Sequence, residues 1–584
     1  MRKLARTPPE MSCKLMPHQR FGLEWLMNRE ASRHRGGILA DDVGLGKTIQ
    51  ALALILSRRP AAAASAASAE GKGPTLIVVP LSLLKQWEDE INGKIKKEHK
   101  LNILVYHGAA IRKKSVFHRG HSNQYDVVLT TYDTLAAEWR KKKVAEGEKK
   151  KEAAGNSSMK GAAAPTILNL FSPDAHFHRV ILDEAQLIKN PDTQRSQAAM
   201  ELEADFRLCL TGTPLMNNTD ELYPLLRFLR VKPYVTKSVF EDKIGKPLRR
   251  LLPTEVDNSS GRESDSALDK VRELLNEVLL RRMKTDRIKG RPIVDIPERR
   301  EKDQSVSFSE GERELYNLIR DNYKSLVDER NNGLVKNIRL KQMCLHPGLL
   351  PFDLLVSLKA IAGKDGRAIL PALGKLQSGN SKKNDSIPKE MSEYRSAKID
   401  SAMGLIESIL RADDTAKIIV FSEYTTFLDV FEGFVRAKRD EFRKSKTTST
   451  RINYGRYDGQ NTPDERDRAV DHFGHEGNLL LMSLTAGGYG LNLHWATHVV
   501  LMEPVYNPYV EQAIGRAHRV GQTRQLVVYR LFVEGTVEDN IRDMQQSKKA
   551  LVKRVLGDNK VSFDRGEIVP SSYWYGKMKR GIQR

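Results

Sequence analysis

One stretch decides the fold of this chain, Leu39-Ala40-Asp41-Asp42-Val43-Gly44-Leu45-Gly46-Lys47-Thr48. Gly44 and Gly46 allow the backbone N–H groups to turn inward around an anion. Lys47 can reach the β- and γ-phosphates of a nucleotide, and the Thr48 hydroxyl can hold Mg²⁺. The stretch therefore has the chemistry of a phosphate-binding loop.

The loop departs from the general pattern G-x-x-x-x-G-K-[ST] at one position, because Asp41 stands where that pattern has glycine. The apolar run from Ile49 to Leu56 predicts a buried helix whose N-terminus favours phosphate. Taken alone, these residues leave two interpretations open. They form either a nucleotide-binding loop or a glycine turn followed by a helix.

The composition narrows the class of protein. With 584 residues, 40% hydrophobic and 29% charged, the chain is long enough for roughly three or four globular domains. No stretch is apolar enough for a membrane span. Cys13, Cys209 and Cys344 are too widely spaced for a disulfide framework or a zinc knuckle, which indicates a reducing compartment. The net charge of +22 favours a polyanionic partner, although merely basic soluble proteins share it.

Continuous apolar runs follow the loop and predict buried parallel strands. They lie at Thr75–Pro80, Asp126–Thr131, Val180–Asp183 and Phe206–Leu210. Between the first two runs, Leu84, Trp87 and Ile91 have helical spacing, which predicts a helix. Strands that alternate with helices predict an α/β sheet.

Polar residues stand where these strands end, at the sheet edge where ligands bind. Asp183 could hold Mg²⁺, and Glu184 could polarise an attacking water. The turn Thr211–Pro214 is suited to sensing a γ-phosphate, or is an ordinary turn. Upstream, Gln19 could bond an adenine edge through its amide, or could face solvent before an amphipathic helix.

The pattern is less regular from 231 to 395, where helical segments alternate with polar stretches. We expect helical insertions and a linker there, with helices at 268–280, 310–324 and 334–345. The basic low-complexity segment at about 140–165 is expected to be a disordered or frayed insert. A nuclear localisation signal, a phosphate-contacting tail and a solvated loop all remain open for it.

A second α/β lobe begins near Ala397, with strands predicted at 418–421, 479–482, 498–502 and 526–529. Arg516 and Arg519 are three apart on a predicted helix, so they are expected to share a face. Two guanidiniums on one face could grip a γ-phosphate. The alternative is a basic helix that faces solvent.

These motifs, in this order, resemble those of the superfamily 2 helicase-like ATPases, in particular the SWI/SNF-type double-stranded DNA translocases. The motifs are those at 41–48, Leu210–Leu215, Leu280–Lys284, Ser483–Leu493 and Gly515–Gln522. The resemblance covers roughly residues 14 to 550. In that family the missing first glycine is normal, so Asp41 is no longer an anomaly.

The resemblance implies an α/β fold of two RecA-like parallel-sheet lobes with helical insertions between them. Lobe 1 would occupy 1–230, the insertions and linker 231–395, lobe 2 396–555, and a basic tail 556–584. It also implies ATP and Mg²⁺ at an active site where the lobes meet. The expected catalytic residues are Lys47, Asp183, Glu184, Arg516 and Arg519. The expected nucleotide contacts are Gln19, Asp42, Gly44, Gly46, Lys47, Thr48, Gln186 and Gly490, with Thr48 and Asp183 on the metal.

Two positions depart from the family pattern. Gln186 stands where the family usually has His, and we expect it to bond the Thr211 and Gly212 region, which alters coupling without loss of hydrolysis. The segment Arg339–Pro347 is similar to a repair-linked subgroup that carries a RING zinc finger. No cysteine follows Cys344, so zinc and RING-dependent ubiquitin ligation are not expected.

We therefore expect an ATP-dependent double-stranded DNA translocase that acts in chromatin remodelling or DNA repair. We expect a monomeric core that acts in the nucleus. The expected partners are duplex DNA and nucleosomes or other DNA-bound proteins, and no membrane partner is expected. The rivals are a strand-separating DNA or RNA helicase and a non-enzymatic DNA-binding scaffold. The sequence does not identify the remodelled substrate, nor whether the chain is a short family member or part of a longer protein.

Overall fold

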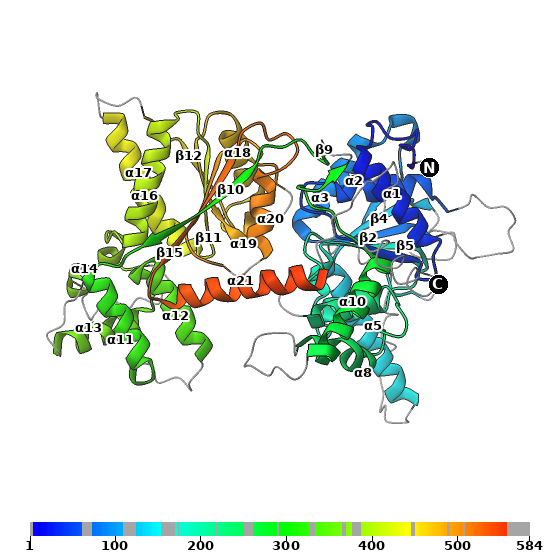
Figure 1. Cartoon of the computed structure of the whole chain (residues 1–584), viewed down its shortest axis with the longest axis horizontal. Helices are drawn as coiled ribbons and strands as arrows, with labels where there is room; N and C mark the ends of the chain where they lie inside the picture. The colour runs from blue at the N-terminus through cyan, green and yellow to red at the C-terminus, as the bar shows by residue number, and fades with distance from the viewer. Residues whose placement is uncertain are drawn as a thin grey trace, which may run out of the picture. The chain divides into compact units, whose positions relative to one another are not determined.

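The computed structural model describes residues 4–60, 73–108, 124–153, 170–172, 175–215, 219–249, 261–288, 291–326, 333–364, 370–375, 387–444, 450–487, 491–505 and 508–556. The chain divides into two compact units. Lobe 1 is Met1–Asp295 together with Lys548–Arg584, and lobe 2 is Ile296–Ser547. Each lobe contains one parallel sheet with helices on both faces, which confirms the predicted fold class (Figure 1).

Among the described residues, the lobe 1 sheet has seven strands, all paired in parallel. Their order across the sheet is β3 (Ile103–Val105), β4 (Val127–Thr131), β2 (Thr75–Val79), β5 (Phe177–Asp183), β6 (Ala204–Leu210), β1 (Gly36–Leu39) and β7 (Leu279–Leu280). The four predicted strands are β2, β4, β5 and β6. The strands β1, β3 and β7 are only two to four residues long, too short to give a periodic signal.

Helices cover both faces of this sheet. Figure 1 shows α1 (Pro17–Glu30), α2 (Lys47–Ser57) and α3 (Leu81–Lys94) on one side and α5 (Tyr132–Ala153) and α10 (Gly261–Val278) on the other. Other α-helices among the described residues of this lobe are α6 (Gln194–Met200), α7 (Leu222–Phe228), α8 (Lys237–Phe240) and α9 (Lys246–Arg249). The short strands β8 (Arg287–Ile288) and β9 (Arg291–Pro292) pair antiparallel. The sheet is apolar on both faces because both are covered.

One expectation in this lobe is wrong. Residues 140–153 are the C-terminal part of helix α5, not a disordered or frayed insert. Lys142 and Lys143 each lie 2.8 Å from a carboxylate oxygen of Glu201, which neutralises part of the basic run. Composition alone did not reveal this partner, because Glu201 is distant in sequence. The rest of the predicted insert, 154–165, lies outside the described residues.

In the part of lobe 2 that the structure describes, the sheet has six strands, again all parallel. Their order is β10 (Arg299–Val306), β15 (Leu526–Val533), β14 (His498–Leu501), β11 (Ile418–Ser422), β13 (Leu479–Ser483) and β12 (Tyr454–Tyr457). The four predicted strands are present. The edge strand β10 lies within the segment expected to hold only helices and linker. Its charged sequence gives no apolar run, and Arg299 pairs with Glu511 at 2.8 Å instead.

Two groups of helices cover this second sheet. One face packs against α16 (Ala397–Ala412) and α17 (Thr425–Lys444), and the other against α18 (Pro463–His475), α19 (Leu484–Gly487) and α20 (Pro508–Ala517). The core of the first face extends into α11 (Glu310–Leu326), α12 (Gly333–Leu345), α13 (Phe352–Lys364), α14 (Pro371–Lys375) and α15 (Lys389–Ser392). Helix α21 is Val537–Leu556. The helices predicted at 268–280, 310–324 and 334–345 correspond to α10, α11 and α12.

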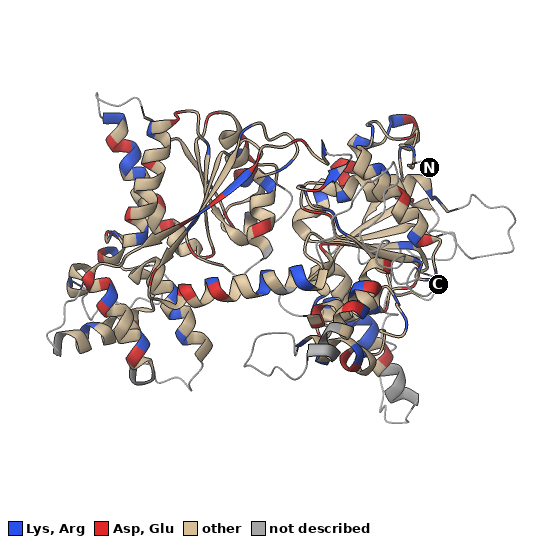
Figure 2. Cartoon of the chain, in the orientation of Figure 1, with Lys and Arg blue, Asp and Glu red and all other residues tan. Residues whose placement is uncertain are grey.

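The charged residues of both lobes are mixed in sign. Figure 2 shows acidic and basic positions interspersed along α17 and α21. Within the described part of the chain, no helix combines the length and the apolar character that crossing a bilayer requires.

A buried ion pair fixes the base of lobe 2. The Lys398 ammonium lies 2.6 Å from Glu538 Oε1, and both side chains are 0% exposed. Glu538 Oε2 also accepts a hydrogen bond of 2.7 Å from the Val533 N–H. The pair therefore ties the start of α16 to the turn between β15 and α21.

We predict that Lys398→Met lowers the free energy of unfolding of lobe 2 by about 3–5 kcal/mol, because Glu538 is left buried without its counter-charge. The double variant Lys398→Met/Glu538→Gln should recover most of this loss, since no uncompensated charge remains. Chemical denaturation monitored by circular dichroism measures both. A double variant as unstable as the single one would contradict the explanation.

Candidate nucleotide-binding site

The parallel sheet of lobe 1 brings three chain segments together at one edge. Leu39 of β1 and Asp183 of β5 both pair with Leu210 of β6. The carboxyl ends of these three adjacent strands therefore lie side by side. The phosphate loop, the turn that begins at Thr211, and the acidic pair after β5 leave the sheet at this edge, where ligands bind in open α/β sheets.

The loop itself has the backbone of an anion site. Gly44 and Gly46 have φ angles of 94° and 83°, which side-chain-bearing residues rarely adopt. Gly46 caps α2, so Lys47 and Thr48 are the first two residues of that helix. Lys47 Nζ donates a 2.7 Å hydrogen bond to the Asp41 carbonyl oxygen. Turned-in glycines, a helix N-terminus and an ammonium group together fit a phosphate.

The carboxylate of Asp183 is held by two donors. Trp87 Nε1 donates to Oδ2 at 2.8 Å, and the Glu184 N–H donates to Oδ1 at 2.9 Å. Burial, and then the charge of Glu184, raise the pKa of Asp183 to about 6, although the Trp87 bond and the charge of Lys47 oppose the rise. An anion that is short of compensating charge is suited to a cation, and the residues present fit Mg²⁺.

Gln186 links the acidic pair to the neighbouring strand. Its Nε2 donates to Glu184 Oε2 at 2.7 Å, and its Oε1 accepts from the Thr211 hydroxyl at 2.7 Å. The expected hydrogen bond to the Thr211 region is therefore confirmed. The amide makes a continuous chain from the residue proposed to polarise water to the turn that would sense phosphate.

Gln19 and Asp42 both contact the surroundings of the loop. Gln19 is 8% exposed, and its Nε2 donates to the Leu45 carbonyl at 3.3 Å, so the solvent-facing alternative is wrong. Its contact with adenine stays a prediction. The carboxylate of Asp42 accepts a 3.4 Å bond from the Lys284 N–H.

Sequence reasoning missed three residues of this site. Trp87 has a helical spacing that indicates only a core residue, and its indole N–H gives no signal in the sequence. Gln50 and Arg282 contact the loop from α2 and from the segment after β7. Arg282 lies within the motif Leu280–Lys284, but nothing in the sequence connects that motif to the loop.

In lobe 2 the two arginines differ from expectation. Helix α20 ends at Ala517, so Arg516 is helical while Arg519 lies in the turn beyond. The prediction that they share a helix face is wrong, because the helix ends between them. Arg519 Nη1 donates to the Leu491 carbonyl at 3.5 Å. The predicted contact residue Gly490 lies outside the described residues.

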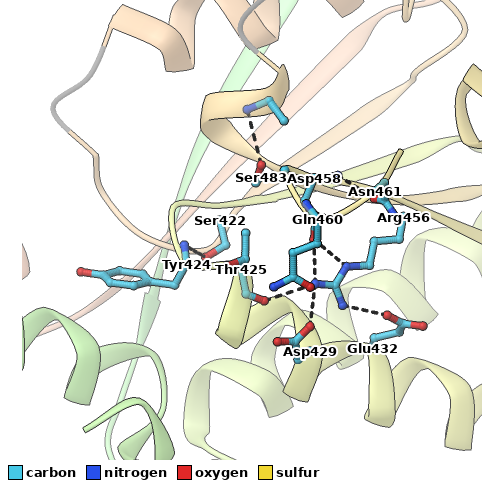
Figure 3. Close-up of polar contacts among 12 residues, drawn as sticks. Ser422, Tyr424, Thr425, Asp429, Glu432, Arg456, Asp458, Gln460, Asn461 and Ser483 are labelled. Atoms are coloured by element: carbon cyan, nitrogen blue, oxygen red, sulfur yellow. Dashed lines mark hydrogen bonds and ion pairs between the residues drawn. The ribbon is translucent and has the colours of Figure 1, made fainter. Parts of the chain in front are cut away.

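A polar cluster lies at the carboxyl edge of the lobe 2 sheet (Figure 3). Arg456, at the end of β12, reaches the carboxylates of Asp429 at 2.6 Å, Glu432 at 2.9 Å and Asp458 at 2.7 Å. Burial opposes the charge of Arg456, but these three carboxylates together raise its pKa. The cluster ties the turn after β12 to the first turns of α17.

Glu503, two residues after β14, is buried near this edge. Its Oε1 accepts hydrogen bonds from the Ser422 hydroxyl, at 3.1 Å, and from the Glu423 N–H. Its Oε2 has no hydrogen-bond partner among the residues that the structure describes. Burial, the largest cause, raises the pKa of Glu503 to about 8. The group is therefore held mostly protonated near neutral pH.

Comparison with known families identifies the chain. The family described as "SNF2-related domain" matches residues 18–349. The chain belongs to this family. "Helicase conserved C-terminal domain" matches residues 398–521, within lobe 2. This SNF2-related chain is thus a member of a helicase-like, ATP-dependent superfamily, and family membership implies the use of ATP.

Two similar curated proteins are longer than this chain. "ATP-dependent helicase ULS1" of Saccharomyces cerevisiae is 30% identical over 95% of this chain and 41% of its own length. "DNA repair protein RAD5B" of Arabidopsis thaliana is 29% identical over 90% of this chain and 46% of its own length. The chain thus spans less than half of either. A solved structure of the Sulfolobus solfataricus SWI2/SNF2 ATPase core in complex with dsDNA is 23% identical, with a TM-score of 0.39, over 97% of this chain and 99% of that one.

We predict that Gln186→Ala lowers kcat for ATP hydrolysis by roughly threefold to tenfold and leaves the nucleotide Kd unchanged. The lost hydrogen bonds link Glu184 to Thr211, and each is worth about 0.5–1.5 kcal/mol. Thr211→Val should have a similar effect. Since both residues belong to one chain of bonds, the double variant should be little worse than either single one. Steady-state ATPase assays measure this, and strictly additive losses would contradict it.

We also predict a pH effect from Glu503. The folded state binds this proton more tightly than the unfolded state between pH 4.5 and about 8. The contribution of Glu503 to the free energy of unfolding therefore falls as pH rises through that window. Glu503→Gln keeps an oxygen for both donors and removes the slope. Its melting temperature relative to the wild type should rise from pH 5 to pH 8, and a constant difference would contradict the assignment.

Proposed function

We propose that this chain is an ATP-dependent double-stranded DNA translocase acting in chromatin remodelling or DNA repair. The observation that carries the proposal is the meeting of the phosphate loop, Thr211 and the acidic pair Asp183–Glu184 at one sheet edge. The family membership supports ATP as the nucleotide. Bound ATP supplies the phosphoanhydride bond whose hydrolysis drives movement.

The phosphate loop would hold the β- and γ-phosphates. Lys47 would exchange its contact with the Asp41 carbonyl for the phosphates, since a charged acceptor makes the stronger bond. The adjacent N–H groups of α2, and the backbone around Gly44 and Gly46, would bind the phosphate oxygens. Gln19 would contact the adenine edge, and Asp42 would contact the nucleotide.

Thr48 and Asp183 would hold Mg²⁺. The two hydrogen bonds from Trp87 and the Glu184 N–H orient the Asp183 carboxylate before the cation arrives. Glu184 would polarise the attacking water, and Gln186 would report through Thr211 whether the γ-phosphate is present. Arg516 and Arg519 belong to lobe 2, and their role at the γ-phosphate stays a prediction.

Duplex DNA is the proposed partner. The net charge of +22 supports a polyanion, and binding through phosphates should be salt-sensitive with little base readout. The names of the relatives, a helicase and a DNA repair protein, support DNA as the substrate, and we propose that the chain acts on it in the nucleus. Nucleosomes or other DNA-bound proteins are the proposed objects of remodelling.

The decisive experiment measures ATP turnover with naked duplex, nucleosomes, single strands and RNA. We expect duplex DNA to raise kcat by about an order of magnitude, a barrier change of about 1.4 kcal/mol, and single strands or RNA to have little effect. Greater stimulation by single strands would favour a strand-separating helicase. Turnover that no nucleic acid changes would contradict the proposal.

We predict that Glu184→Gln lowers DNA-stimulated kcat by about 10²- to 10⁴-fold, the usual size of a general-base contribution. Glutamine retains an oxygen for the bond from Gln186, so nucleotide and DNA affinities should persist. Phosphate release measures the loss, and equilibrium titration with fluorescent ADP provides the control. Unchanged phosphate release would show that another residue polarises the water.

A further inference from the structure

The residue that breaks the general loop pattern has a buried counter-charge. Asp41 is 0% exposed, and the Arg282 side chain is 1% exposed. Arg282 Nε donates to Asp41 Oδ1 at 2.8 Å, and Nη2 contacts Oδ2 in parallel. Paired bonds of this kind between a guanidinium and a carboxylate are both strong and directional. The start of the phosphate loop is thus joined to a residue 241 positions downstream.

Gln50 extends this contact to the end of the loop. Its Nε2 donates to Asp41 Oδ2 at 3.1 Å and to the Gly46 carbonyl at 3.1 Å. Its Oε1 accepts from Arg282 Nη2 at 2.8 Å. We call Asp41, Gln50 and Arg282 the loop clamp, because together they fasten both the first and the last residues of the loop.

Helix α1 closes the loop clamp from the other side. Arg282 Nη1 donates to the His18 carbonyl, and His18 Nε2 donates to the Leu45 carbonyl at 3.0 Å. At Gly22 an added Cβ would lie 1.7 Å from Gln50 Oε1 and 2.8 Å from Arg282 Nη2. Only glycine permits this approach. The loop clamp is therefore almost fully buried, and α1, α2 and the segment after β7 all contribute to its contacts.

The loop clamp also includes the residue whose backbone carbonyl holds the phosphate-binding lysine. Lys47 Nζ donates to the carbonyl of Asp41, the residue that Arg282 holds by its side chain. A loop already held in shape loses less conformational entropy when a ligand binds. Without Arg282, the loop would instead contain a buried Asp41 carboxylate with no counter-charge, which would repel the phosphates.

We propose that Arg282 is a positioning residue for the nucleotide, which acts through Asp41 and Gln50 to keep the phosphate loop in its binding shape. The inference rests on the proposed function, in which this loop binds ATP. Arg282 itself touches no substrate in this proposal. Its effect should therefore appear in nucleotide affinity and not in the chemical step.

Lobe 1 offers a matched control. Arg179 Nε and Nη2 donate to the two carboxylate oxygens of Glu30 at 2.5 and 3.1 Å, with side chains 1% and 4% exposed. Arg179 Nη2 also reaches the carbonyl of Arg58, which caps the far end of α2 from the loop. This pair equals the Arg282 pair in chemistry and burial but does not contact the phosphate loop.

The experiment compares Arg282→Lys, Gln50→Met and Arg179→Lys in the whole chain. Lysine keeps the charge but cannot make two parallel bonds, and methionine removes the link to Gly46 while the ion pair remains.

We expect Arg282→Lys and Gln50→Met to raise the Kd of fluorescent ADP and the KM for ATP about tenfold, equivalent to about 1.4 kcal/mol. The kcat at saturating ATP should change by no more than about twofold, which is less than about 0.5 kcal/mol. Arg179→Lys should lower the melting temperature as Arg282→Lys does but leave the Kd unchanged.

Three outcomes would overturn the inference. Arg282→Lys and Arg179→Lys could raise the Kd equally, which would mean that Arg282 contributes only stability. Gln50→Met and Arg282→Lys could both leave the Kd unchanged. If the wild-type chain itself binds no ADP, the proposed function fails first and the inference with it. Gln50→Met provides the test even if Arg282→Lys does not fold.

Discussion

The parallel pairing of β5, β6 and β1 is the constraint on which the candidate site depends. Parallel neighbours end at the same sheet edge, which brings Asp183, Leu210 and Leu39 level with one another. Leu39 and Leu210 are nevertheless 171 positions apart in the sequence. Each segment that follows carries different chemistry, and none could act alone. The sheet order converts three separate sequence motifs into one surface.

Buried ion pairs then hold the connections in place. Asp41 with Arg282, Glu30 with Arg179, and Lys398 with Glu538 each join segments more than a hundred residues apart. Such pairs add little net stability, because desolvation offsets the attraction, but an unpaired partner is costly. Their value lies in specifying a single arrangement. At Asp41 that arrangement is the shape of the phosphate loop, and at Glu538 it is the turn before α21.

Much of the fold followed from apolar runs and helical spacing. The eight predicted strands are present because a strand buried on both faces is apolar throughout. The omitted strands had no such signal: β10 is a charged edge strand, and β7 has only two residues. Helix α5 continues through the start of the basic run, where Glu201 pairs with Lys142 and Lys143, and α20 ends before Arg519. The first error concerns an ion pair with a distant residue and the second the end of a helix, and the local sequence pattern encodes neither.

By itself the sequence determined the chemistry of lobe 1: glycines that allow φ angles above zero, Lys47 and Thr48 beside them, and Asp183 and Glu184 after a strand. It also determined the family, because those motifs recur in one order. The tertiary structure decided which groups control them. Trp87 orients Asp183, Gln186 bridges Glu184 to Thr211, and Arg282 neutralises Asp41. Hydrogen bonds and ion pairs act over about 3 Å between residues far apart in the chain, so only the folded chain reveals them.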